Sequence, residues 1–142
     1  MLSLASRLHD IGKLFIPADI LNKPGKLNEI EWALIENHPE EGFKILKEIH
    51  FGPPVAEIVR QHHERIDGSG YPRGLKNEEI MLEARILAAA DVVEAVSSHR
   101  PYRPALGLEM ALEEIKSGVG TKYDEEVVKG CLELFSSGFL PD

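Results

Sequence analysis

The stretch that most restricts the possible folds of this chain is residues 82–97. It is the longest segment with helical periodicity, it is apolar on nearly all sides, and it contains three successive alanines at positions 88–90. This pattern predicts a central buried helix whose small side chains let neighbouring helices approach closely. Asp91 lies in the middle of the segment, where a carboxylate is costly unless it is paired or bound to a metal.

The rest of the chain consists of short helical stripes separated by glycine and proline. Leu4, Leu8 and Ile11 recur at helical spacing, so we expect His9 and Asp10 in the last turns of a first helix that Gly12 ends. Because no stretch shows sustained strand alternation, the predicted fold class is all-α, a helical bundle of about six to seven helices. Further helices are expected after the capping box Asn28–Glu31, at about 39–49, from Val55 to an end at His62 and His63, and at about 108–117 and 125–136.

Length and charge restrict the kind of protein. The 142 residues suit a single domain, residues 1–142, and the net charge of -8 argues against general binding to nucleic acid, which needs a basic face. Cys131 is the only cysteine, which excludes an intramolecular disulfide. No apolar run approaches the roughly 20 residues of a membrane helix, so we expect no membrane contact and a cytoplasmic location.

Histidine and aspartate residues form the candidate site. The pair His62-His63 directly precedes a loop with glycine at positions 68, 70 and 74, and a second doublet, His9-Asp10, lies near the start of the chain. Iron, manganese and zinc all accept imidazole nitrogen and carboxylate oxygen, and a pair of metals needs roughly six to eight such ligands. The candidate metal ligands are His9, Asp10, His38, His62, His63 and Asp91.

Each candidate also has an explanation without a metal. His38 could be an N-cap, the pair His62-His63 could favour a helix macrodipole, and His9-Asp10 could be a surface ion pair. Asp91 is hardest to explain in this way because its neighbours are so apolar. His50 and His99 lack such surroundings and are interpreted as ordinary surface or packing residues.

Taken together, the motifs resemble the HD-GYP domains. They are His9-Asp10-Ile11-Gly12-Lys13, residues 20–27, His38, His62-His63-Glu64, residues 67–75, residues 84–86, Asp91 and Arg100-Pro101-Tyr102-Arg103. The resemblance runs from residue 1 nearly to the end. It implies a helical HD-superfamily fold with a two- or three-metal centre. It also implies hydrolysis of the bacterial second messenger cyclic di-GMP to linear pGpG, and further to GMP.

The resemblance also implies a role for each site residue. His9 and Asp10 correspond to the HD pair, with Asp10 bridging two metals and acting in catalysis. His38, His62 and His63 correspond to ligands of one metal and Asp91 to a ligand of the other, with iron or manganese preferred and zinc accepted. Lys13, Arg100 and Arg103 would bind substrate phosphate. Gly70, Tyr71 and Pro72 would shape the substrate site and contact diguanylate cyclase domains.

One departure from the family pattern concerns the start of the chain. The family normally supplies a further histidine from helices upstream of the HD pair, but only eight residues precede His9 here. We therefore expect one metal to have fewer protein ligands, through truncation, a site completed by a neighbouring subunit, or a degraded site. Without the upstream helices part of the core would be exposed, and this would also promote homodimerisation.

The alternative function is a catalytically impaired module that binds cyclic di-GMP or docks proteins. A third interpretation, another nucleotide phosphohydrolase of the HD superfamily, ranks last.

Overall fold

Helices make up the regular structure of this protein. The computed structural model describes residues 1–51, 54–98 and 106–139, and this part of the chain contains no strand, only isolated bridges. The prediction of an all-α fold is confirmed. The α-helices are α1 (Leu2–Leu8), α2 (Ala18–Leu21), α3 (Glu29–Glu36), α4 (His38–Leu46), α5 (Val55–Gln61), α6 (Leu82–Ser97), α7 (Leu108–Ser117) and α8 (Glu125–Ser136), with 3₁₀-helices at Ile11–Phe15 and Asn77–Glu79.

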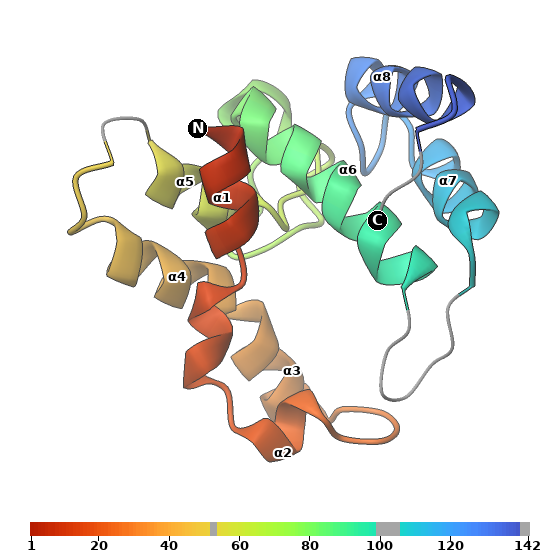
Figure 1. Ribbon diagram of the computed structural model, residues 1–142. Coiled ribbons are helices and arrows are strands. Elements are labelled where there is room, and N and C mark those ends of the chain that lie inside the picture. The colour runs from red at the N-terminus through yellow and green to blue at the C-terminus, as the bar shows by residue number, and fades with distance from the viewer. Residues whose placement is uncertain (52–53, 99–105, 140–142) are drawn as a thin grey trace.

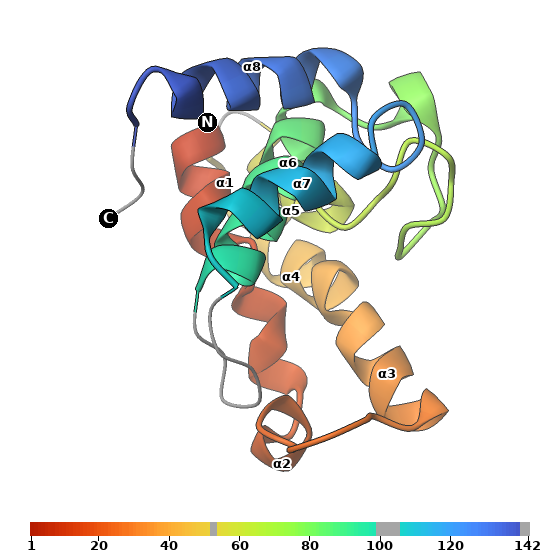
Figure 2. The ribbon, with the colours of Figure 1, turned by 90° about the vertical axis from the view of Figure 1, so that its right-hand side faces the viewer.

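Helix α6 joins the two parts of the core. It runs through the middle of the molecule, with α1, α4 and α5 on one side and α7 and α8 on the other (Figure 1). Ala84 and Leu87 of α6 pack into a first apolar cluster with residues of α1, α4 and α5, whereas Val93 packs into a second cluster with α7 and α8. Asp91 lies on α6 between these two contacts. The view at right angles shows α3 and α2 extending away from this core (Figure 2).

Three details of the predicted helices are wrong. Helix α1 ends at Leu8, so His9 is its C-cap and Asp10 lies outside it. Gly12 does not end the helical structure but lies inside the 3₁₀-helix that follows. Helix α4 ends at Leu46 and does not include Ile49.

Helix α6 is also less buried than its sequence indicates. Ala84 and Leu87 to Ala89 are buried, but Leu82 is 57% exposed and Ala90 is exposed. The reason is that helices pack on two sides of α6, while a third strip faces an open cavity of about 940 Å³ between α6 and α8. An apolar sequence therefore does not by itself distinguish a buried face from the wall of a groove. In the described residues no helix is long and apolar enough to cross a membrane.

Candidate metal centre

All six predicted metal ligands meet at one place in the fold. They come from the end of α1, the start of the following 3₁₀-helix, the start of α4, the end of α5 and the middle of α6. His9 Nε2 lies 3.5 Å from Asp10 Oδ2 and 3.4 Å from Asp91 Oδ1, and His38 Nε2 lies 3.4 Å from Asp10 Oδ1. The two doublets and the two single residues therefore form one cluster.

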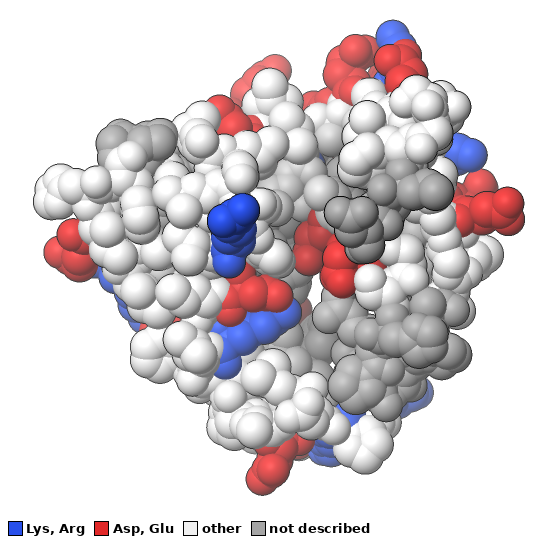
Figure 3. Space-filling view, viewed as in Figure 1, with Lys and Arg blue, Asp and Glu red and all other residues white. Residues whose placement is uncertain are grey.

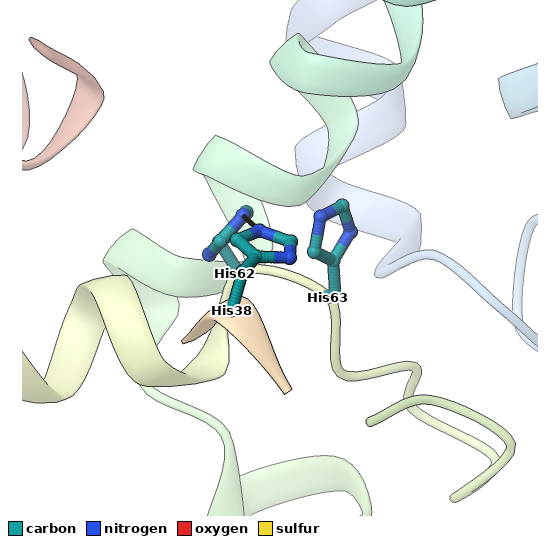
Figure 4. Close-up of side chains that lie close together, drawn as sticks. All are labelled: His38, His62 and His63. Carbon is teal, nitrogen blue, oxygen red and sulfur yellow. Dashed lines mark hydrogen bonds between the residues drawn. The ribbon is translucent and has the colours of Figure 1, made fainter. Parts of the chain in front are cut away.

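The cluster contains two overlapping groups of ligand atoms. One group is His38, His62 and His63, and the other is His9, Asp10 and His62; within each group the ligand atoms lie within 4.8 Å of one another. The three rings of the first group are shown in Figure 4, where His38 and His62 lie side by side and His63 approaches from the loop that follows α5. His62 belongs to both groups, and Asp91 joins the second through His9. The protein thus has residues that could hold a metal.

Backbone carbonyl groups set the orientation of three of the four rings. In His9, His38 and His62 the Nδ1 atom lies 2.6 Å from the carbonyl oxygen three residues earlier. A carbonyl oxygen can only accept a hydrogen bond, so Nδ1 carries the proton. The lone pair of each neutral ring is then on Nε2, and these are the atoms that converge in the cluster.

Without a cation, this arrangement leaves electron pairs facing one another. His38 Nε2 and His62 Nε2 are 3.4 Å apart, and His38 Nε2 is also 3.4 Å from Asp10 Oδ1. Asp10 Oδ1 is buried and has no hydrogen-bond partner among the described residues. A divalent metal satisfies all of these atoms at once, because imidazole nitrogen and carboxylate oxygen are its usual ligands. The residues present therefore fit a metal ion.

Burial and neighbouring charges adjust the protonation of the cluster. Burial lowers the pKa of His62 to about 4, so its ring is neutral at neutral pH and available as a ligand. Burial also lowers the pKa of His63 strongly. Burial raises the pKa of Asp10, but contacts with His38 and Lys13 outweigh it and hold that pKa well below its ordinary value. At neutral pH His62 and His63 are thus neutral and Asp10 is ionised, whereas the contact with Asp91 raises the pKa of His9.

The Gly-Tyr-Pro loop packs directly against the cluster. The Tyr71 ring lies 4.8 Å from the His63 ring, and the Tyr71 N–H donates to the His63 carbonyl at 3.2 Å. Glu64, which is 2% exposed, accepts the N–H groups of Arg73 at 2.8 Å and Leu75 at 2.9 Å. No role for Glu64 was predicted from the sequence. The sequence pattern that could have indicated its role is a carboxylate directly after a histidine pair and before a glycine-rich loop, whose backbone N–H groups need acceptors.

Two glycines allow the close approach of backbones around the cluster. A Cβ atom at Gly12 would lie 1.8 Å from the carbonyl oxygen of His38, and one at Gly70 would lie 2.4 Å from the nitrogen of Arg65. Gly12 thus permits the segment after Asp10 to pack on the start of α4. Gly70 permits the loop to fold back on the segment that carries His63. This packing alone explains why glycine stands at position 70. The contact of Gly70 with substrate stays a prediction.

A cavity of about 970 Å³ opens beside the cluster. Lys13, His38, His63, Tyr71 and Asp91 line it, whereas Gly70 and Pro72 do not. Lys13 Nζ also donates to Asp10 Oδ2 at 2.7 Å, which places a cation beside the cluster. Arg100 and Arg103, the other predicted phosphate-binding residues, lie outside the described residues. The remaining lining residues are Ile20, Leu21, Asn22, Lys23, Gly25, Lys26, Leu27, Trp32, Ile35 and Ala95.

The surface charge of the face in Figure 3 is mixed. Acidic and basic side chains are interspersed among the residues that are described on it, and these residues form no extended basic patch. The described residues of this face therefore lack the broad positive field that a nucleic-acid backbone requires.

Comparisons with known proteins agree with the geometry. Residues 1–127 match the family described as HD domain. The chain is 46% identical over 137 residues to a cyclic di-GMP phosphodiesterase of Thermotoga maritima, which covers 94% of this chain and 37% of that protein. It is 42% identical over 141 residues to the 3′3′-cGAMP-specific phosphodiesterase 3 of Vibrio cholerae, covering 97% of this chain and 30% of that protein. The chain thus spans about a third of the length of these curated relatives.

Two solved structures share the fold. A cyclic GMP-AMP-specific phosphodiesterase of V. cholerae superimposes with a TM-score of 0.70 at 22% identity, covering 95% of this chain and 37% of that one. An HD-GYP-type protein of Bdellovibrio bacteriovorus, Bd1817, gives a TM-score of 0.74 at 22% identity, covering 95% of this chain and 43% of that one. The resemblance noted in the motifs is confirmed, and this chain belongs to the HD domain family, among its HD-GYP members.

Proposed function

We propose that this chain is a metal-dependent phosphodiesterase domain that hydrolyses cyclic di-GMP to linear pGpG and further to GMP. The observation that carries the proposal is the convergence of three Nε2 atoms and of Asp10 Oδ1, which has no hydrogen-bond partner among the described residues, beside a cavity that His38 lines. Relatives named cyclic di-GMP phosphodiesterase support the choice of substrate. They also favour the enzyme over the alternative of an impaired binding module.

The two overlapping groups would each hold one divalent metal, with Asp10 between them. His38, His62 and His63 form one set of ligands, and His9 and Asp91 belong to the other. Iron and manganese suit this mixture of nitrogen and oxygen ligands, zinc accepts the same atoms, and a third metal would need ligands beyond these two groups. Bound metals would make a water molecule nucleophilic near neutral pH and polarise a phosphate oxygen.

The protein groups around the metals would position the substrate. Lys13 lines the cavity beside Asp10, where its ammonium group can balance the charge of a phosphate oxygen. Tyr71 lines the cavity next to His63. Arg100 and Arg103 are proposed to contact phosphate from the other side, with Gly70 and Pro72 shaping the loop that carries Tyr71.

Partners are proposed from the same resemblance. Residues 1–142 would act as one HD-GYP domain, and its Gly-Tyr-Pro loop would be the surface for diguanylate cyclase domains. Arg73 in that loop is exposed, as a docking surface requires. A homodimer is the proposed assembly.

Substitution of Asp10 tests the proposed function. The purified chain, loaded with manganese, should release pGpG from cyclic di-GMP, and Asp10→Ala should abolish this turnover, because both groups of ligands adjoin that carboxylate. Product analysis by chromatography measures the reaction, and circular dichroism checks that the helices persist. Asp19→Ala is the matched control, since Asp19 is exposed on α2 and outside the cavity lining. Turnover that is unchanged in Asp10→Ala would contradict the assignment.

A further inference from the structure

Trp32 lies in the cavity beside the metal centre. It is the only tryptophan of the chain, it is 49% exposed on α3, and it lines the same cavity as His38, His63 and Asp91. A single exposed apolar side chain is ordinary on a protein surface and needs no explanation. This one differs because its exposed face belongs to the wall of a concave site that also contains lysines.

The surroundings of Trp32 are suited to a flat aromatic ligand. Ile20, Leu21 and Leu27 line the same cavity and supply an apolar wall. Lys26 is exposed in the same lining, and no ion pair to it is found within residues 1–51, 54–98 and 106–139. Lys23 is different, because its Nζ is held by both carboxylate oxygens of Glu31 at 2.7 and 2.8 Å. The cavity thus has an aromatic face, an apolar wall and one available cation at its rim.

The position of Trp32 relative to the metal ligands is fixed by helical geometry. Trp32, Ile35 and His38 are spaced three residues apart and all line the cavity. Asn37, which joins α3 to α4, has right-handed helical dihedral angles. At 1.5 Å per residue, Trp32 lies about 9 Å along the helix axis from His38. Such a separation can be bridged by a nucleotide whose phosphate is at the metal centre and whose base extends along α3.

We propose that Trp32 is a stacking platform for one purine base of the cyclic dinucleotide that the metal centre cleaves. The proposal rests on the proposed function and assigns a base subsite to its cavity. Stacking on an aromatic side chain is tolerant of base identity, because every base has a π face. Trp32 therefore contributes affinity for a cyclic dinucleotide in general and does not distinguish guanine from adenine. Discrimination between the two bases has to come from hydrogen-bonding groups elsewhere in the site.

Steady-state kinetics of the manganese-loaded chain test this role. Trp32→Ala should raise the KM for cyclic di-GMP about 10- to 100-fold, the loss expected for one base stack, with kcat changed by less than about 3-fold. The KM for 3′3′-cGAMP should rise by a similar factor. Trp32→Phe keeps a ring and should recover most of the affinity. Ile30→Ala is the control, since Ile30 is 77% exposed on the same helix but is absent from the cavity lining.

Tryptophan fluorescence gives a readout that needs no turnover. Because Trp32 is the only tryptophan, all tryptophan emission of the chain reports on this position. GMP should quench the emission in a saturable manner, and ribose 5-phosphate, which lacks a base, should not. The Ile30→Ala variant should give the same titration as the unmodified chain.

The outcomes separate this inference from the proposed function. Hydrolysis of cyclic di-GMP with an unaltered KM in Trp32→Ala overturns the stacking platform and leaves the phosphodiesterase intact. Equal effects of GMP and ribose 5-phosphate on the emission also overturn it. If the unmodified chain hydrolyses no cyclic dinucleotide, the proposed function fails, and the nucleotide titration alone decides whether Trp32 binds a base.

Discussion

Three of the ligand rings share one local arrangement at the end of a helix. His9 and His62 are the C-caps of α1 and α5, and His38 lies two residues after the end of α3. Each ring donates from Nδ1 to a carbonyl oxygen in the last turn of the helix that precedes it. This hydrogen bond directs Nε2 away from the helix end. The C-termini of α1, α3 and α5 thus lie at the cluster, together with the N-terminus of α4.

Gly12 is the residue whose replacement we expect to be most damaging outside the ligands. In Gly12→Ala the new methyl group would meet the His38 carbonyl at 1.8 Å and the Gly42 nitrogen at 2.7 Å, both of them backbone atoms. The segment after Asp10 must then move away from α4. We expect a loss of about 1–3 kcal/mol or more in the free energy of unfolding, as for overpacked cores, measured by urea denaturation. Manganese binding should weaken as well, because Asp10 and His38 move apart.

Gly130 provides the matched control for this substitution. It lies within α8, and a Cβ atom there would meet nothing within 4 Å. Gly130→Ala should therefore stabilise the chain by up to about 1 kcal/mol, through helix propensity alone. If both substitutions changed the stability equally, the close contact between Gly12 and α4 would not exist in solution.

At the scale of elements, the loop after α5 depends on one buried carboxylate. Glu64 joins residues 63–65 to the far end of the loop by accepting from Arg73 and Leu75. Gln61 acts in a similar way, since its Oε1 accepts the Met81 N–H at 2.7 Å at the start of α6. These side chains replace the strand pairing that would otherwise hold such a loop, and they place Tyr71 beside His63.

Replacement of Glu64 should release the loop. Glu64→Ala leaves two N–H groups without their acceptor, so we expect a loss of about 2–4 kcal/mol in the free energy of unfolding, measured by urea denaturation. Glu64→Gln retains one carbonyl oxygen and should lose about half as much. The manganese-loaded Gln variant should also show a raised KM, because Tyr71 is no longer held in place. Equal stability of the Ala and Gln variants would show that the two hydrogen bonds are not formed.

The helices could be predicted from the sequence where their signals are local. The capping box of Asn28 and Glu31 is present, and the bounds of α6, α7 and α8 agree with the apolar periodicity. The ends of α1 and α4 could not be predicted in this way. Helix α1 stops at Leu8 because the His9 ring takes the carbonyl of Ser6, and Gly12 remains helical because α4 packs against it. Both causes are contacts between residues, and the apolar periodicity of the sequence does not reveal them.

At the scale of the whole molecule, convergence of the six ligands was predicted from the motifs and not from any helical pattern. The motif resemblance named the residues, and the fold brings them within reach of one another. The buried role of Glu64 and the position of Trp32 in the cavity were missed, because each depends on segments far apart in the chain. A single sequence shows which side chains can act as metal ligands. The hydrogen-bond partners of a buried carboxylate are known only from the folded structure.

Because the ligands come from five segments, metal binding is coupled to the stability of the whole molecule. The ligands of a folded centre bind metal better than those of an unfolded chain, so each occupied site stabilises the fold. At a free metal concentration 100 times the dissociation constant, one site contributes about 2.7 kcal/mol. Manganese should therefore raise the melting temperature, and a chelator should reverse the increase.

Asp10 and His63 distinguish one site from two. Asp10 places one carboxylate oxygen beside His9 and the other beside His38, so it adjoins both groups of ligand atoms, whereas His63 belongs to one. Asp10→Ala should therefore lose both metals and the whole manganese-dependent rise in melting temperature, and His63→Ala should lose one metal and about half of the rise. Elemental analysis after dialysis counts the metals, and thermal denaturation measures the shift. His50→Ala is the control, because His50 is exposed and outside both groups. Equal metal content in the two variants would mean that a single shared site, and not a pair, occupies the centre.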